Sequence, residues 1–385
     1  MMQAYNNNNL YNKLVQQKAA EAFEAQNINA ESFKKILEAH PSALYTPNFF
    51  IRIALGFLTV IAVVFSGLIL WLLTSASSDT AFAGLCMALC IACYIALELL
   101  INAKQYYNAG LDNVLMCCSV IFLISAFLIQ DFTNNDVITS FVMILFCLWL
   151  CIRFTDAFMA MLSFASLYIF ILLLCTKAGV IGEAVAPFLL MLTSAIVYVI
   201  ANTLLKKDKL LFYHYCCNAI RLMALVLFYT SANYFAVNEG SRELLSSTVK
   251  MPATLGIVYW ILTIIIPVAY LVYGIIKKDL MFIRTGFILI IITILTIHYY
   301  YHPLPTEIDM LIGGLLLIAI SYALIQYLRT PKHGFSFENT GRNKKDLLNA
   351  EALIVAQVFG RSNTQQKGFE FGGGSSGGGG ATGNY

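Results

Sequence analysis

The sequence predicts an all-α membrane protein, a polytopic bundle of about ten transmembrane helices preceded by a small helical cap. Two observations carry this prediction. Apolar residues make up 59% and charged residues 12% of the 385-residue chain, whereas soluble domains average roughly 45–50% and about 25%. The apolar residues also gather into long runs, most of them near the roughly 20 residues that a membrane-spanning helix needs. The net charge of +3 is small and scattered, so we expect no nucleic-acid partner.

Residues 1–48 precede the first apolar run and lack the pattern of a signal peptide. We expect them to form a cytoplasmic cap of two short helices, at about 10–26 and 30–39. Asn29 is typical of a helix start, and Pro41 is typical of a helix end.

The predicted bundle covers residues 49–329. Its third and fourth runs are short, so we expect these helices to stand upright or to reach the surface through flanking polar residues. The ten runs lie at about 50–73, 80–101, 114–130, 138–152, 157–175, 185–205, 210–235, 255–276, 280–299 and 311–328.

The basic residues of the loops predict the orientation of the bundle. Seven lie in loops on the side of the N-terminus: Lys104, Arg153, Lys206, Lys207, Lys209, Lys277 and Lys278. Three lie in the opposite loops: Lys177, Arg242 and Lys250. Because cytoplasmic loops carry the excess of Lys and Arg, we expect both termini in the cytoplasm.

Two segments follow the last apolar run. Residues 330–371 form a predicted cytoplasmic segment, with a short amphipathic helix over 342–361 that lies on the membrane or on the protein itself. Residues 372–385 are rich in glycine and serine and are typical of a flexible tail. The cap and the tail are the two places where we consider a protein partner. The oligomeric state stays open.

Two stretches resemble a known family. They are "NINAESFKKILEAHPSALYTPNFFIRIALGFLTVIAVVFSGLILWLL" and "YYNAGLDNVLMCCSVIFLISAFLI". Together they are similar to an uncharacterised bacterial family of predicted integral membrane proteins that open with a short helical cap. The resemblance covers about the first 130 residues. It implies a polytopic bundle and no activity or catalytic residues.

The most unusual polar pattern lies in the seventh run. His214, Asn218 and Arg221 are spaced to share one helix face. A helix that begins near residue 210 puts Arg221 about 16 Å from its cytoplasmic end. A buried arginine needs a partner, for which we expect Glu98 rather than Asp156. The alternative is an arginine that reaches the membrane surface.

The cysteines and histidines offer weaker candidates. All ten cysteines fall within the runs or at their ends, where we expect them to pack as small apolar residues without disulfides. So many unpaired thiols fit a protein of a bacterial inner membrane, which is where we expect this one. His298 and His302 in "HYYYHP" have a spacing that suits a metal. We favour the alternative that these tyrosines form an aromatic belt at the membrane surface, and we expect no cofactor.

Three function classes remain from the sequence. We favour a membrane scaffold or a regulatory protein. The alternative is a small-molecule carrier, because Pro267 must kink the eighth helix and could open a cavity near Arg221 that Tyr259, Tyr270 and Tyr273 line. An intramembrane enzyme is less favoured, because the apolar runs contain neither His-Glu-x-x-His nor Gly-x-Ser-x-Gly.

Overall fold

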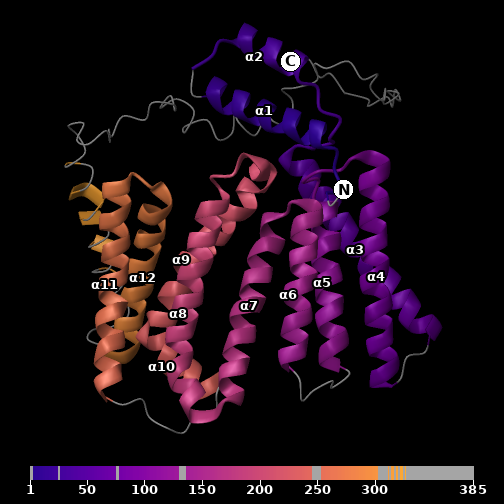
Figure 1. The fold of residues 1–385 in the computed structure, drawn as a ribbon. Coiled ribbons are helices and arrows are strands. Elements are labelled where there is room, and N and C mark those ends of the chain that lie inside the picture. Colours follow the sequence, from indigo (N-terminus) through magenta and orange to yellow (C-terminus); the bar gives the residue numbers. More distant parts are fainter. Residues whose placement is uncertain are drawn as a thin grey trace, which may run out of the picture. The chain divides into compact units, whose positions relative to one another are not determined.

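The computed structural model describes residues 3–24, 27–74, 78–129, 136–244, 253–301 and separate positions between 311 and 326. Within these residues the protein is all-α and contains no β-strand, which confirms the predicted fold class (Figure 1). The chain divides into two compact units, Met1–Glu338 and Asn339–Tyr385. The second unit, with the whole of the predicted amphipathic helix and the glycine-rich tail, lies outside the described residues.

Two short helices form the cap, α1 (Asn7–Glu24) and α2 (Ala30–Ala39). The boundaries of α2 are those predicted. The side chain of Asn29 accepts a hydrogen bond of 2.8 Å from the backbone N–H of Ser32. This bond satisfies one of the free N–H groups at the helix start. The first helix begins three residues earlier than predicted.

The cap is bonded to the bundle through the backbone. The N–H of Ala4 donates to the carbonyl of Arg153 over 2.9 Å. The N–H of Tyr45 donates to the carbonyl of Gln105 over 2.9 Å, and the N–H of Tyr107 donates to the carbonyl of Tyr45 over 3.1 Å. The cap and the bundle thus belong to one compact unit. We call this end of the bundle the cap end and the opposite end the far end.

Nine helices in the described part are long and apolar enough to cross a membrane. The predicted third and fourth spans are longer than expected, at 19 residues each. The predicted tenth span, 311–328, lies half outside the described residues. The nine are α3 (Phe49–Thr74), α4 (Asp79–Lys104), α5 (Leu111–Ile129), α6 (Asp136–Phe154), α7 (Ala157–Lys177), α8 (Gly179–Leu204), α9 (His214–Ala232), α11 (Ala253–Lys277) and α12 (Leu280–Tyr301).

The predicted seventh span, 210–235, begins where the sequence placed it but ends three residues early, because the candidate span covers Leu210–Ala232. A 3-10 helix, η1 (Asp208–Tyr213), precedes α9. Asn233 then leaves the helical conformation, and its side chain accepts a bond of 3.1 Å from the N–H of Ala236. This bond starts a short helix at the far end, α10 (Tyr234–Leu244). The chain therefore turns where an uninterrupted apolar run predicted one helix.

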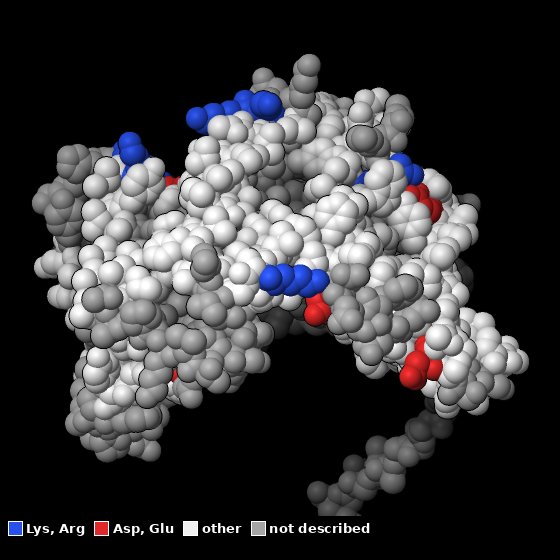
Figure 2. Space-filling model, turned by 60° about the horizontal axis from the view of Figure 1, so that its bottom comes forward, with Lys and Arg blue, Asp and Glu red and all other residues white. Residues whose placement is uncertain are grey.

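Neighbouring helices pack as hairpins, α4 with α5, α6 with α7, α8 with α9 and α11 with α12. The main core lies between α4, α5, α6 and α7, with Cys216 from α9, and includes Tyr5, Leu10 and Leu44 from the cap segment. A second core joins α9 to α11 and α12. Figure 2 shows only a few separate places with charged side chains on the face brought forward there.

Candidate functional site

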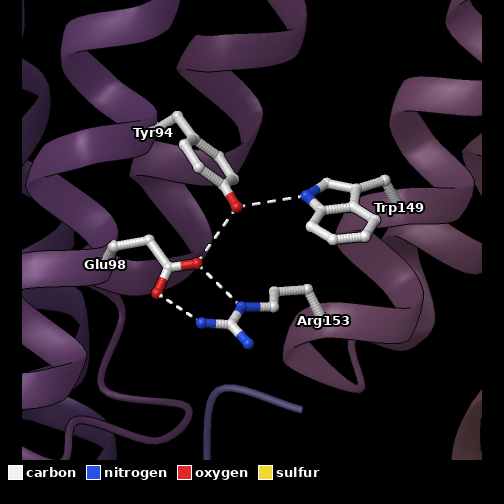
Figure 3. Close-up of polar contacts among 4 residues, drawn as sticks. All are labelled: Tyr94, Glu98, Trp149 and Arg153. Atoms are coloured by element: carbon white, nitrogen blue, oxygen red, sulfur yellow. Dashed lines mark hydrogen bonds and ion pairs between the residues drawn. The ribbon is translucent and has the colours of Figure 1, made fainter. Parts of the chain in front are cut away.

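A cluster of four polar side chains joins α4 to α6 (Figure 3). The Arg153 Nε donates to Oε1 of Glu98 over 2.8 Å, and its Nη2 donates to Oε2 over 3.0 Å. The Tyr94 hydroxyl donates to Oε1 of Glu98 over 3.0 Å and accepts a bond of 3.1 Å from Nε1 of Trp149. Because the ion pair is bidentate and partly buried, its geometry is well defined.

The local sequence explains this arrangement. Tyr94 and Glu98 are four residues apart on α4, and Trp149 and Arg153 are four apart on α6. Each helix therefore presents one ring and one charge on the same face. The sequence had indicated a loop position for Arg153. The structure instead places Arg153 in the last turn of α6. Glu98 is thus the partner of Arg153, and its predicted pairing with Arg221 was wrong.

Arg221 forms a second cluster near the cap end. Its Nη2 donates to Oδ2 of Asp279 over 2.9 Å and to the hydroxyl of Tyr198 over 3.3 Å. Its Nη1 donates to Oδ1 of Asn218 over 3.3 Å. The guanidinium carbon also lies 5.4 Å from the centre of the Tyr198 ring, within the range of a cation–π contact. Asn218 is thus a partner of Arg221, while His214 is not part of this cluster.

The packing order explains why Asp279 replaces the predicted partner. The regular helix α9 begins at His214, so Arg221 lies only about 10 Å from its start. Asp279 lies in the turn between α11 and α12, and α9 packs against both of these helices. Glu98 lies on α4, which packs against α3 and α5. Asp279 was missed because the sequence places it in a basic loop next to Lys278.

The residues around Pro267 form a filled interior. Pro267 lies inside α11 without ending it and is fully buried. Tyr259 is 2% exposed and Thr263 is 0% exposed. A water-sized space beside them would leave accessible surface on these side chains. Among the residues that the structure describes, these three side chains therefore leave almost no accessible surface for a substrate.

The other two tyrosines of the predicted cavity lie elsewhere. The Tyr270 hydroxyl donates to the carbonyl of Leu225 over 3.3 Å. The ring of Tyr273 packs 4.7 Å from that of Phe282, and the side chain is exposed on the outside of α11. The ring of Tyr270 also packs on Phe282, with ring centres 5.3 Å apart, so Tyr270 and Tyr273 share this neighbour, whereas the ring of Tyr259 packs on Phe188.

A buried hydroxyl network that the sequence did not predict joins α9 to α12. The Tyr229 hydroxyl and the Thr293 Oγ1 are 2.8 Å apart. The Asn233 Nδ2 donates to the Tyr229 hydroxyl over 2.9 Å and to Oγ1 of Thr296 over 3.2 Å. Single Thr, Asn and Tyr residues are common in apolar runs. The sequence therefore does not reveal this network, which is recognised only from the contacts between the side chains.

Two carboxyl groups lie beneath the cap. Oδ1 of Asp156 accepts a bond of 2.8 Å from the N–H of Met159 and caps α7. Burial raises the pKa of Asp156, and Asp112 raises it further, whereas backbone N–H groups and Arg52 lower it. Asp112 is 2% exposed, and its Oδ1 has no hydrogen-bond partner among the described residues. The sequence did not single out Asp112, because it precedes the predicted third span.

The weaker candidates have plain surroundings. His298 lies in the last turn of α12, and His302 lies outside the described residues. No group of three or more His, Cys, Asp or Glu side chains in the described part is placed to hold a metal ion. Tyr299 and Tyr300 belong to an aromatic cluster with Trp260. All ten cysteines are free thiols, and eight are buried.

No family model, curated protein or solved structure matches this chain. The nine long apolar helices make it a multi-pass membrane protein.

Proposed function

We propose that this protein is a scaffold of the bacterial inner membrane, with the cap in the cytoplasm as the element that binds a protein partner. The observation that carries this proposal is how the polar side chains of the bundle are used. Glu98 pairs with Arg153, Arg221 pairs with Asp279, and Asn233 bonds to neighbouring hydroxyls. Polar side chains that bond to one another across helices hold those helices together, which is what a scaffold requires.

The packing at Pro267 favours a scaffold over a carrier. A carrier places its substrate near the middle of the membrane, commonly at a broken helix. Here α11 is continuous, and Pro267, Tyr259 and Thr263 on this helix are all buried.

The cap supplies a surface for a partner. Its backbone bonds to the α4–α5 turn and to Arg153 hold it in place. The outer face of α2 carries exposed charges, including Lys34 and the ion pair between Lys35 and Glu31. Exposed, mixed charges suit a water-facing protein contact.

The described loops support the cytoplasmic assignment of the cap. The connections at the cap end include Lys206, Lys207, Lys277 and Lys278, whereas Lys177 lies at the far end. Cytoplasmic loops carry the excess of basic residues.

Site-specific photo-crosslinking in cells tests the scaffold. A photoreactive residue at Lys34, on the exposed face of α2, is compared with one at Thr80, which is exposed at the far end. We expect a protein adduct of defined size from position 34 alone, and its loss in a Lys35→Glu variant that accumulates normally. The absence of any adduct at position 34, or the same adduct at position 80, would contradict the proposal.

Thiol accessibility tests the carrier alternative. In a Thr263→Cys variant we expect no reaction with a water-soluble thiol reagent in membranes, whereas a Ser32→Cys variant on the exposed cap reacts. Peptide mass spectrometry separates these sites from the native cysteines. Similar rates at both positions would favour a water-filled carrier pathway.

A further inference from the structure

A groove opens to the outside of the bundle between α4 and α6. It has a volume of about 230 Å³ and an almost entirely apolar lining of Cys90, Ile91, Tyr94, Phe146 and Trp149. Both helices pack on α5, which lies between them. All five lining residues lie within candidate membrane spans. Since the hydrocarbon region of a bilayer holds no water to fill such a groove, an acyl chain is the chemistry available there.

The groove ends at the polar cluster of Figure 3. Trp149 donates to Tyr94, and one turn closer to the cap end Arg153 pairs with Glu98. Cys90, which lies one turn before Tyr94, and Phe146 line the part nearer the middle of the helices. From the cap end inward, the groove therefore presents first the charged side chains, then the rings of Tyr94 and Trp149, and then an apolar wall. A phospholipid in the leaflet at the cap end has the same order, with headgroup, interfacial region and chain.

We propose that this groove binds one phospholipid whose headgroup carries both a phosphate and a primary ammonium, as phosphatidylethanolamine does. One acyl chain lies along Ile91 and Phe146. The phosphate lies against the guanidinium of Arg153, and the ammonium donates to the carboxylate of Glu98.

Charge complementarity selects this headgroup. The pair of Glu98 and Arg153 is neutral as a whole and partly exposed. An anionic headgroup such as phosphatidylglycerol attracts Arg153 but repels Glu98, and separating a partly buried pair strands one charge. The quaternary ammonium of phosphatidylcholine has no N–H to donate to the carboxylate. Phosphate with primary ammonium gives each side chain a counterpart.

Native mass spectrometry of the full chain tests the proposal. The protein is released from nanodiscs that contain equal amounts of phosphatidylethanolamine, phosphatidylglycerol and phosphatidylcholine. We expect one phosphatidylethanolamine to stay bound at activation energies that strip other lipids. Ile91→Trp fills the groove and should abolish this retention. Ile95→Trp is the matched control, because Ile95 is 51% and Ile91 53% exposed on the same helix, and Ile95 does not line the groove.

A second variant tests the headgroup. Glu98→Gln keeps the shape of the side chain but removes the charge that faces the ammonium. We expect the preference for phosphatidylethanolamine over phosphatidylglycerol to fall roughly tenfold, as for the loss of one hydrogen bond to a charged group. The Ile91→Trp variant leaves the ion pair intact, so it tests the site even if Glu98→Gln unfolds. Equal retention in Ile91→Trp and wild type, or equal retention of the three lipids by wild type, would overturn the proposal.

Discussion

Arg221 illustrates how a guanidinium is held among apolar helices. An anion, an amide oxygen and an aromatic ring face it from the α11–α12 turn, α9 and α8. The side chain of Arg221 is 13% exposed and that of Asp279 is 29% exposed. The removal of one partner therefore leaves a partly buried charge without its counter-charge.

We expect Arg221 and Asp279 to be energetically coupled. Arg221→Leu and Asp279→Asn should each lower the free energy of unfolding in detergent, and the double variant should lose less than their sum. The expected coupling is about 1–3 kcal/mol. Asp279→Asn is used because the side chain also accepts a bond from the N–H of Met281, which an amide oxygen can keep.

The control for this cycle pairs Arg221→Leu with Glu98→Gln. Glu98 belongs to the other ion pair, so these two losses should add. Additive losses for Arg221 and Asp279 as well would mean that their contact contributes no stability.

Asp156 has a pH dependence of predictable sign. Burial raises the pKa of its carboxyl above the ordinary value of 3.8. Its contribution to stability is therefore fully present below the ordinary pKa and is lost as the pH rises through the raised value. Asp156→Asn keeps the cap of α7 and cannot ionise. Its thermal stability relative to wild type should rise with pH from about pH 4 upward.

The comparison needs a variant that loses the N-cap hydrogen bond of α7. Asp156→Ala should be less stable than Asp156→Asn by about 1 kcal/mol at every pH, the usual effect of a lost N-cap. If the difference in melting temperature between wild type and Asp156→Asn stays constant across the pH series, the assigned role of burial is refuted.

At the scale of elements, the turn between α4 and α5 connects the cap, α3 and the bundle. Gln105 and Tyr107 bond to the backbone of Tyr45. Gly110 has a φ of 93°, a conformation that side chains with a Cβ rarely adopt. A Cβ at this position would also collide with the backbone carbonyl of Arg52 on α3.

Gly110→Ala should therefore lower the stability of the protein by about 1–3 kcal/mol, through backbone strain and the loss of close packing with α3. Gly84→Ala is the matched control. A Cβ at Gly84 in α4 meets nothing within 4 Å, and alanine favours a helix by about 1 kcal/mol relative to glycine. Thermal unfolding of both variants in one detergent measures the difference. A Gly110→Ala protein as stable as Gly84→Ala would exclude a close approach of α3 at this turn.

At the scale of the whole molecule, successive spans run in opposite directions (Figure 1). The basic loops then share the cap end. We expect compartment-specific reporter fusions at Lys207 and Lys278 to read cytoplasmic, and fusions at Asn134 and Glu243 to read periplasmic. A different number of spans precedes each of the four positions, so the fusions test the order of spans independently. A clear reversal at any one of them would contradict the proposed orientation.

The sequence by itself determined the features that depend on neighbours along the chain. Apolar runs predicted an all-α membrane bundle and placed nine described spans, because helix formation in a bilayer depends on local hydropathy and length. The start of α2 at Asn29 was predictable, since a capping bond joins residues only three apart. The free cysteines followed from their positions inside apolar runs.

Only the tertiary structure decided which distant residues meet. Arg221 pairs with Asp279 and Glu98 with Arg153 across 58 and 55 residues. Asn233 ends α9 inside an apolar run, where its side chain bonds Tyr229 and the next helix. These outcomes depend on the order in which helices pack, and helical periodicity specifies the face of a residue without specifying the helix opposite it. The physical reason is that a bilayer accepts any apolar face, so hydropathy does not distinguish one helix neighbour from another.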